Sequence, residues 1–437
     1  MDAASTVMRG DLLVRDGAIA ALGNCSAALA ELPGGRADER FDARSGFVLP
    51  GLVQGHLHLC QTLFRGLAEQ SDLLPWLRES IWPLEHAHNE SSIAASARLA
   101  LVELIAGGVT CVNDMGTVRH TDAIGAILEE CGVRALFGKA LMDRGEGAPR
   151  GMLEDRRAAL EDALALMKRF HGAGGGRLQV TLAPRFVLSC SDELWRDVVA
   201  ASRERGLTIH THLAESPREG REVAAAVGTS AARYFAAREV LSTRFVGAHG
   251  VWLEDDELSA LKGTDAALVH CPGSNLKLGS GFANVRRWRA AGVRCGIGSD
   301  GAACDNRLDT FHELSLAGGI SRALEPQKPL AAREVLALAT CDGARALGLA
   351  DRVGSLEVGK QADVIVVEGE GPHLAPNASR DPYSTLVYAA RPSDVRLTMV
   401  AGRVLYRDGA WSTLDAGRAA ADARAETQGL LRRMEAA

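Results

Sequence analysis

Two histidines separated by one residue stand at the end of a short apolar stretch, in the sequence GLVQGHLHLCQTLFRG. The residues before them, FVLPGLVQG, are apolar or β-branched with Pro50 and Gly51 as turn residues, and they predict a buried strand. Alternate residues of a strand point to the same face, so His56 and His58 direct both imidazoles at one point. Such a pair can chelate a metal ion. A single pair of this kind is more often part of a hydrogen-bonded core, so the prediction needs further ligands.

Similar polar residues end later apolar stretches. The segments HTHLAE, GAHG, VHCP and GSDGA contribute His212, Glu215, His249, His270 and Asp300. In a barrel of parallel strands, the carboxyl ends of all strands meet around one mouth. Three imidazoles and a carboxylate suit a divalent ion such as Zn²⁺, with an open position for water. The alternative, in which each histidine only caps its own strand, requires five strand ends to carry such residues independently.

The elements that would position these residues alternate along the middle of the chain. Helical stretches such as SSIAASARLALVELIAGG and EDALALMKRFHGAG carry apolar residues at helical spacing, and short apolar stretches lie between them. Eight such stretches predict strands: FVLPGLVQGHLHL, GVTCVNDM, RALFGKALMD, LQVTLAPRF, LTIHTHLAE, TRFVGAHGV, AALVHCPGSN and VRCGIGSDG. Eight strands separated by helices predict an α/β fold with a (β/α)8 TIM-like barrel.

Both ends of the chain carry short β-strand patterns. DLLVRDGAIAAL is typical of a hairpin with a D-G turn, and similar patterns return in GSLEVGKQADVIVVEG and VRLTMVAGRVLYRDGAW. We therefore expect a small composite β-sandwich built from both chain ends. The predicted domains are residues 1–48 (the N-terminal part of the sandwich), 49–350 (the barrel) and 351–437 (the C-terminal part of the sandwich, with a surface helix from Leu414 onward).

The composition is that of a globular protein, with 47% hydrophobic and 24% charged residues. The net charge of −6 comes from interspersed acidic and basic residues, which argues against nucleic acid or a membrane surface as a partner. The nine cysteines are scattered without a C-x-x-C pair, which favours a reducing compartment. The start MDAASTVMRGDLLVRDG is too polar for a signal peptide, and no apolar run approaches the roughly 18 residues that span a bilayer. We expect a cytoplasmic protein.

Several motifs together resemble the amidohydrolase superfamily over nearly the whole chain: PGLVQGHLHL, HLAE, AHG, SNLKLGSG, GSDGAACDN and LEVGKQADVIVV. The similarity is to the branch of hydrolytic deaminases and chlorohydrolases, which includes S-adenosylhomocysteine/methylthioadenosine deaminases, guanine deaminases and triazine hydrolases. It implies a metal-dependent barrel with a composite β-sandwich, in agreement with the patterns above. It also implies a further strand before MDAAS, so we expect either that the recorded start is late or that the sandwich lacks an edge strand.

The resemblance implies four ligands for one ion of Zn²⁺, or of Fe²⁺, per subunit: His56, His58, His212 and Asp300. The family's ligand lies three residues before the glutamate, which excludes His210, although His210 points the same way from deeper in the barrel. Strand four ends in Pro184, Arg185 and Phe186, without the lysine that would bridge a second metal ion. A mononuclear deaminase is therefore favoured over a binuclear cyclic-amide hydrolase.

The resemblance also implies catalytic roles for Glu215, His249 and Asp300. A metal ion lowers the pKa of a bound water from about 15.7 to near 7. Asp300 then takes the proton of the attacking water, Glu215 protonates the ring nitrogen beside the reacting carbon, and His249 stabilises the developing oxyanion. The expected reaction converts a ring C–NH2 to C=O with release of ammonia.

Four residues are predicted to bind the substrate: Gln61, Trp82, Glu85 and Arg185. An aromatic ring can stack on a planar heterocycle, while amide or charged groups read its edge, although Trp76 and Trp82 fit a core equally well. Arg185 and Gln61 match the guanine deaminases. The glutamate of LPWLRESIWPLE is compatible with both branches.

Other features follow the adenosine-type enzymes, namely LPWLRESIWPLE, SNLKLGSG and GSDGAACDN. Lys139 stands roughly where those enzymes bind a homocysteine carboxylate through arginine, and Arg150 is a second candidate for that charge. These signals conflict over the substrate. We expect an amino-substituted purine, pterin or related N-heterocycle, with a carbonyl-bearing ring preferred over an adenine nucleoside.

The alternatives are a deaminase of 5′-modified adenosine and a triazine-type chlorohydrolase or alkylaminohydrolase. Glu215 favours an amine as the leaving group, because an amine leaves only when protonated. A catalytically silent scaffold would have lost ligands, and the sequence keeps each one. Apart from the small-molecule substrate, the only expected partner is a second copy of the chain in a homo-oligomer, by analogy with related barrels.

Overall fold

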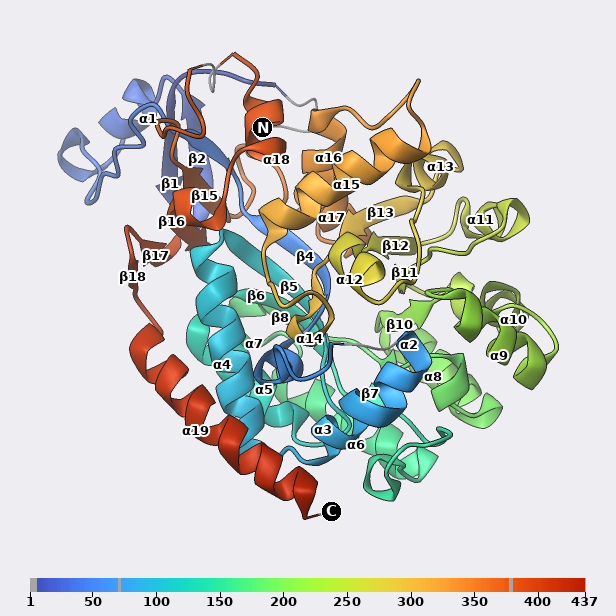
Figure 1. The fold of residues 1–437 in the computed structure, drawn as a ribbon. Helices are drawn as coiled ribbons and strands as arrows, with labels where there is room; N and C mark the ends of the chain where they lie inside the picture. Colours follow the sequence, from blue (N-terminus) through green and yellow to red (C-terminus); the bar gives the residue numbers. More distant parts are fainter. Residues whose placement is uncertain (1–5, 70–71, 377–379, 437) are drawn as a thin grey trace.

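The computed structural model describes residues 6–69, 72–376 and 380–436. Its centre is a closed barrel of parallel strands (Figure 1). In order around the barrel these are β4 (Leu52–His58), β5 (Val109–Met115), β6 (Arg134–Gly138), β8 (Leu178–Val180), β10 (Ile209–Leu213), β11 (Phe245–His249), β12 (Ala266–His270) and β13 (Arg294–Ile297), the last continued by β14 (Asp300–Gly301). Parallel pairing of β14 with β4, and a parallel bridge between Leu182 and Ile209, close the ring. The predicted barrel is confirmed.

The barrel strands are apolar because they are covered on both faces. Every residue of β4, β5, β6, β11 and β12 is buried. Two short strands, β7 (Ala140–Leu141) and β9 (Ala183–Pro184), pair in parallel and extend the third and fourth strands toward the mouth. The polar residues at these carboxyl ends are therefore held by a rigid, solvent-excluded wall.

Helices surround the barrel, as the apolar spacing predicts (Figure 1). The longer ones are α4 (Glu90–Ala106), α5 (Thr121–Cys131), α6 (Arg156–Phe170), α8 (Asp192–Arg205), α9 (Pro217–Val227) and α15 (Thr310–Leu324). The shorter ones are α10 (Ala231–Ala237), α11 (Asp255–Leu261), α13 (Val285–Ala290), α16 (Ala332–Leu338), α17 (Cys341–Ala346) and α18 (Pro382–Tyr388). Side-chain caps fix several starts, such as the capping box that Asn89 and Ser92 form at α4.

Loops at the mouth carry the short helices α2 (Leu73–Trp76), α3 (Trp82–His86), α12 (Pro272–Lys277) and α14 (Ala302–Asp305). A π-helical turn, Leu77–Ile81, joins α2 to α3. A 3-10 turn, Leu59–Phe64, follows β4 directly. These segments cover the ends of strands β4, β12 and β14.

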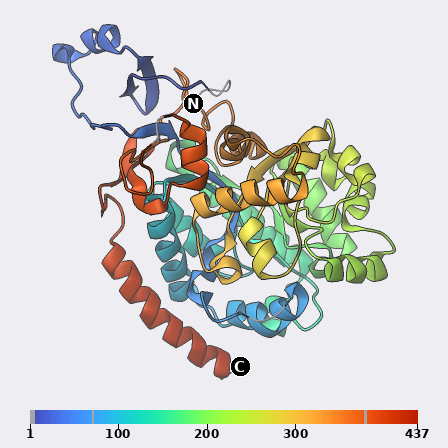
Figure 2. The same cartoon turned by 45° about the horizontal axis from the view of Figure 1, so that its top comes forward.

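Strands from both chain ends form a second layer, which confirms the predicted composite sandwich. β3 (Phe47–Pro50) pairs with β15 (Val364–Val367) in a five-stranded antiparallel sheet, which continues through β16 (Val395–Val400), β17 (Arg403–Arg407) and β18 (Ala410–Trp411). The hairpin of β1 (Asp11–Arg15) and β2 (Ala18–Gly23) packs beside it, and Ile19 N–H donates to Lys360 O at 2.8 Å (Figure 2). The domain limits given above stay predictions.

The chain ends in the helix α19 (Ala416–Glu435), which confirms the predicted terminal helix and lies along α4 (Figure 1). Arg433 Nε donates to Ala87 O at 2.7 Å near its end. No helix within the described part of the chain is long and apolar enough to cross a membrane. The expectation about a strand before MDAAS concerns residues that would precede Met1, and it stays a prediction.

Candidate metal centre and active site

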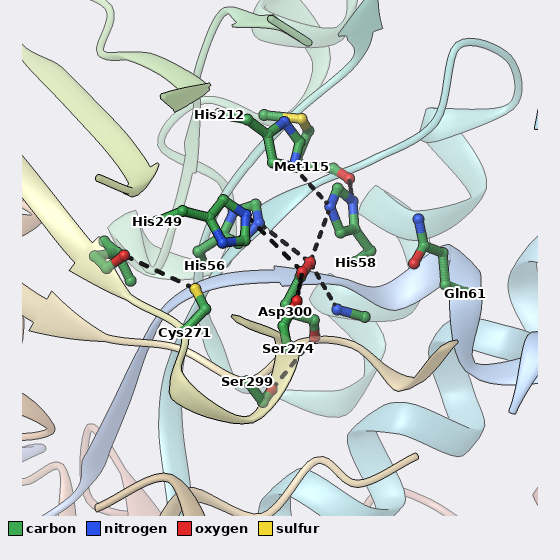
Figure 3. A network of polar contacts seen from close by, with 12 residues as sticks. His56, His58, Gln61, Met115, His212, His249, Cys271, Ser274, Ser299 and Asp300 are labelled. Atoms are coloured by element: carbon green, nitrogen blue, oxygen red, sulfur yellow. Dashed lines mark hydrogen bonds and ion pairs between the residues drawn. The ribbon is translucent and has the colours of Figure 1, made fainter. Parts of the chain in front are cut away.

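Four side chains converge at the carboxyl ends of β4, β10 and β14: His56, His58, His212 and Asp300 (Figure 3). Their potential ligand atoms all lie within 4.8 Å of one another. His58 Nε2 lies 3.3 Å from His212 Nε2, and Asp300 Oδ1 lies 3.3 Å from the Nε2 atoms of His56 and His58. Ligands about 2.0–2.1 Å from a tetrahedral Zn²⁺ lie about 3.3 Å apart, so the residues fit such an ion. The four residues form a metal site.

The other ring nitrogen of each histidine has a partner of its own. His58 Nδ1 donates to Met115 O at 2.8 Å, and His212 Nδ1 donates to Arg185 O at 2.7 Å. His56 Nδ1 lies 2.8 Å from His210 Nε2. These contacts orient the rings and direct each Nε2 at the centre of the four ligands. His210 therefore supports the ligand His56 through its ring nitrogen, a contact that the sequence did not predict.

Two of the functional residues have left-handed backbone conformations. His249 has φ of 74° and Asp300 has φ of 61°. Neither residue is a glycine, so each conformation costs free energy that the surrounding structure must supply. Both side chains are buried and project into the same space, where His249 Nε2 lies 3.4 Å from Glu215 Oε2 and 3.9 Å from Asp300 Oδ2. The strained backbone thus brings His249 between the two carboxyl groups.

The two carboxyl groups at the centre have opposite proton affinities. Burial raises the pKa of Glu215 well above its ordinary value, and the charges of Asp300 and Glu219 raise it further. Burial also acts to raise the pKa of Asp300, but the close imidazole rings of His56, first, and of His58 hold it well below the ordinary value. Two carboxyl groups with pKa values shifted in opposite directions suit the roles of an acid, for Glu215, and a base, for Asp300.

A cavity opens beside the four ligands. It is lined by His58, Gln61, Leu73, Trp76, Leu77, Arg185, Phe186, His212, Glu215, Glu219, Leu278, Asp300 and Cys304. A mainly apolar wall with a few polar groups is typical of a site for a small molecule. Two of the four predicted substrate residues, Gln61 and Arg185, line this cavity.

Glu85 lies behind Gln61 and Arg185 and joins the two side chains. Its Oε2 accepts from Arg185 Nη1 at 2.6 Å, and its Oε1 accepts from Arg185 Nη2 at 2.9 Å and from Gln61 Nε2 at 2.9 Å. Burial acts to raise the pKa of Glu85, but the charge of Arg185 lowers it below the ordinary value. Gln61 Oε1 is buried and has no hydrogen-bond partner within the described chain. The wall therefore offers a cationic donor and a free acceptor side by side.

Trp82 does not line the cavity but is buried in the same apolar cluster as the lining residues Trp76 and Phe186. Lys139 does not line this cavity either. Its Nζ donates to Glu154 Oε2 at 2.6 Å and to Val118 O, and it lines a separate cavity. Arg150 is also absent from the lining set. The binding role of Trp82 stays a prediction.

Sequence reasoning missed Glu219, which lines the cavity from the first turn of α9. Its Oε2 accepts from Glu215 N at 2.7 Å, and it forms a capping box with Ser216. The pattern S-P-R-E, a serine followed three residues later by a glutamate, could have indicated it. His270, at the end of β12, lies apart from the ligands with its ring 6.1 Å from that of Trp288.

Three similar known proteins are deaminases. The sequence model of the amidohydrolase family matches residues 47–405. A 5′-deoxyadenosine deaminase from Methanothermobacter thermautotrophicus is 36% identical over 413 residues, which cover 94% of this chain and 92% of that protein. A 5-methylthioadenosine/S-adenosylhomocysteine deaminase from Moorella thermoacetica is 37% identical over 387 residues, 88% of each chain. An adenosine deaminase from Xanthomonas campestris with bound zinc has a similar structure, with a TM-score of 0.89 and 29% identity over 96% of this chain and 93% of that one.

Proposed function

This chain belongs to the amidohydrolase family, and we propose that within it the protein hydrolyses the exocyclic amino group of the adenine ring in a 5′-modified adenosine. It is a metal-dependent deaminase. The observation that carries the chemistry is the pair of buried carboxyl groups, Glu215 and Asp300, with pKa values shifted in opposite directions beside a four-ligand metal site.

Zn²⁺ is the proposed ion, held by His56, His58, His212 and Asp300, and when bound it supplies a Lewis acid that makes a water nucleophilic at neutral pH. A zinc-bound structure among the similar proteins supports this choice over Fe²⁺. Imidazole nitrogen with a single carboxylate oxygen is a donor set that suits zinc. We propose one ion per chain.

Each step of proton transfer or hydrogen bonding is assigned to a different residue of the chain. Asp300 is ionised at neutral pH, so its carboxylate accepts the proton of the attacking water. Burial favours the protonated form of Glu215, which can donate to the ring nitrogen beside the reacting carbon. His249 donates one ring proton from Nδ1 to Asn275 Oδ1, so its Nε2, 3.4 Å from Glu215 Oε2, can donate to the oxygen that adds to that carbon only when the ring carries both protons. The added water replaces the amino group, which takes a proton and leaves as ammonia.

The names of the similar proteins support an adenosine-type substrate, since the two sequence relatives act on 5′-deoxyadenosine and on 5-methylthioadenosine or S-adenosylhomocysteine. Trp76 and Phe186 provide apolar surfaces of the cavity against which a purine ring could pack. Glu85 would meet the ribose hydroxyl groups only if its ion pair with Arg185 opened.

That ion pair favours a second candidate, a free purine or pterin with a ring carbonyl. Arg185 keeps guanidinium protons beyond the two given to Glu85, and Gln61 Oε1 is a free acceptor, so the wall matches a carbonyl beside a ring N–H. A buried acceptor left without a donor costs roughly 1–3 kcal/mol, which such a substrate would recover.

Ammonia release from a panel of substrates tests the proposal. Zinc-loaded protein is incubated with 5′-deoxyadenosine, methylthioadenosine, S-adenosylhomocysteine, adenosine, guanine, 8-oxoguanine and pterin. We expect the largest kcat/KM for a 5′-modified adenosine, and a preference for guanine or pterin would replace this substrate with the second candidate. No turnover of any compound by fully metallated protein would refute the deaminase assignment for this substrate class.

Glu85→Gln sharpens the same test. With an adenosine substrate, loss of the carboxylate should raise KM by about 10-fold or more, because the ribose loses a charged acceptor. With a free base, the main effect should come instead from Arg185→Met, which removes the donor to the carbonyl. Leu276→Ala, an exposed position on α12, is the matched control and should leave both substrates unaffected.

A further inference from the structure

One short segment contacts all three groups assigned to proton transfer. The segment 271–281 follows β12 and contains α12. Its Ser274 Oγ donates to Asp300 Oδ2 at 2.7 Å (Figure 3). Its Asn275 Oδ1 lies 2.9 Å from His249 Nδ1, and its Ser280 Oγ donates to Glu215 Oε1 at 3.2 Å. These three partners come from three different strands, and a single segment joins them.

The three polar side chains of the segment are almost fully buried, with exposures of 0% for Ser274, 1% for Asn275 and 0% for Ser280. The backbone closes on itself after α12, since Ser280 N donates to Asn275 O at 2.8 Å and Gly279 has φ of +64°. Ser280 is thereby held at a fixed distance from the other two. A displacement of this segment would move all three contacts together.

The far side of the segment is anchored to the barrel. Gly273 N donates to Glu313 Oε2 at 3.0 Å, and a Cβ at Gly273 would lie 2.5 Å from Glu313 Oε1, so a larger residue would displace the Glu313 carboxylate. Lys277 Nζ donates to Ala303 O at 3.0 Å. Trp252 Nε1 donates to Ser280 O at 2.7 Å. The segment is thus fixed at its start, middle and end.

We propose that the segment 271–281 is the positioning element of this active site, in which Ser274 orients Asp300, Asn275 orients His249 and Ser280 orients Glu215. The inference rests on the proposed deaminase function and adds residues that act through the three catalytic groups. None of the three lines the cavity itself. They are positioning residues, since each contacts a reacting side chain from behind.

Each contact engages one atom of its partner and leaves another directed into the site. Ser274 binds Oδ2 of Asp300, while Oδ1, which accepts from Gly301 N at 2.8 Å, lies beside the histidine ligands. Asn275 Oδ1 accepts from Nδ1 of His249, which leaves Nε2 facing Glu215 and Asp300. Ser280 binds Oε1 of Glu215, while Oε2 faces His249. The segment therefore selects which atom of each group meets the substrate or the ion.

Four variants test this proposal on the zinc-loaded, full-length protein: Ser274→Ala, Asn275→Leu, Asn275→Asp and Ser280→Ala. We expect Asn275→Leu and Ser280→Ala to lower kcat by about 10- to 100-fold with KM within about 2-fold, since misplacement of a reacting group acts on the chemical step. Asn275→Asp keeps the acceptor and should retain more activity than Asn275→Leu. Leu276→Ala, in the same helix but exposed, should behave as wild type.

The zinc affinity of the variants distinguishes the contact of Ser274 from those of Asn275 and Ser280. Ser274 contacts a ligand, so Ser274→Ala should weaken zinc affinity by about 10-fold in a competition with a chromogenic chelator. Ser280→Ala and Asn275→Leu should leave zinc affinity unchanged. A double mutant supplies the last readout: in a Glu215→Gln background, Ser280→Ala should cause no further loss of kcat, because it acts only through that carboxyl group.

The proposal is overturned if Ser280→Ala and Asn275→Leu keep wild-type kcat, or if the losses of Ser280→Ala and Glu215→Gln multiply. Equal loss of zinc in all four variants would also overturn it, since the segment would then hold only the fold around the ion. These outcomes require an active wild type, so they are distinct from failure of the proposed function, in which the wild type itself releases no ammonia.

Discussion

Buried charged groups occupy both ends of the barrel, and the two sets differ in how they are paired. At the base, Arg134 at the start of β6 forms an ion pair with Asp363, which precedes β15, and each side chain is 1% exposed. Arg134 Nε and Nη2 donate to the two oxygens of Asp363 at 2.8 and 2.9 Å, and Ala401 N also donates to Asp363 at 2.9 Å. This pair joins the barrel to the five-stranded sheet.

At the mouth, by contrast, buried polar atoms face a common space without partners. His56 Nε2, His249 Nε2 and Gln61 Oε1 lack hydrogen bonds within the part of the chain that the structure describes. Unpaired buried polar atoms cost free energy, and most proteins keep few of them. The ion pair at the base, with both carboxylate oxygens engaged, holds the architecture together even though Arg134 Nη1 has no hydrogen-bond partner in the described ranges of the chain, whereas several free atoms that converge on one space are prepared for a ligand.

The largest effect is expected from a change at the mouth that spares the metal ligands. Glu215→Gln removes the transferable proton, so kcat should fall by about 10³-fold, in the middle of the range for general acid catalysis. Zinc content should stay at the wild-type level. Since burial favours the neutral form of Glu215, the neutral amide should not lower the free energy of unfolding measured in urea. Activity within about 10-fold of wild type would show that another group supplies the proton.

A substitution at the base of the barrel should instead lower stability and leave kcat and zinc content unchanged. Arg134→Met leaves the carboxylate of Asp363 buried without its cation, and we expect a loss of about 3–5 kcal/mol in the free energy of unfolding. The folded fraction should keep its kcat and its zinc. A kcat that falls in proportion to stability would indicate that the two ends of the barrel are coupled. Arg403→Met, an exposed substitution on β17, is a suitable control.

Asp114 tests whether an unpaired atom near the mouth always signals a ligand. Its Oδ1 accepts from Leu59 N at 2.7 Å, its Oδ2 has no partner among the described residues, and burial raises its pKa to about 7. Below pH about 4 both folded and unfolded states carry the proton, and above pH about 7 only the folded state bears the cost of a buried charge.

The stability of the wild type should therefore fall relative to Asp114→Asn as the pH rises from about 4 to 7, by up to about 4 kcal/mol at about 1.4 kcal/mol per pKa unit. Urea unfolding of both proteins at pH 5 and pH 8 measures this difference. A difference that is independent of pH would mean that Asp114 is ionised throughout. Because Asp114 lies outside the cavity lining, kcat of the variant should change little.

The smallest effect is expected at His210, which supports the ligand His56 from behind. His210→Leu should weaken zinc binding by about 10- to 100-fold, as for other partners of metal ligands. His210→Gln can still offer a hydrogen-bonding group and is the matched control, with a smaller loss. Equal affinity of wild type and His210→Leu would show that packing alone orients His56.

Much of this arrangement follows from local sequence patterns. The eight apolar stretches form the eight barrel positions, because a strand buried on both faces must be apolar throughout. The ligands His56 and His58 follow from the two-residue period of a strand, and His212 and Asp300 end strands of the same barrel. A short-range pattern suffices where the fold brings strand ends together.

Contacts that depend on long-range packing were not predictable. The ion pair of Glu85 with Arg185 joins residues 100 positions apart, and no local pattern encodes it. Trp76 rather than Trp82 lines the cavity, and the π-helical turn that lies between them follows from no local sequence pattern. The contacts of Ser274, Asn275 and Ser280 likewise depend on how α12 sits against other strands. Homo-oligomer formation stays a prediction.

Zinc content of the purified protein tests the proposed metal site most directly, measured by mass spectrometry of the metal for wild type, His212→Ala and His270→Ala after equal exposure to zinc. We expect about one ion per chain in the wild type and in His270→Ala, whose histidine lies apart from the ligands, and a large loss in His212→Ala. Wild-type protein that holds no zinc, or equal zinc in His212→Ala and wild type, would contradict the proposed site.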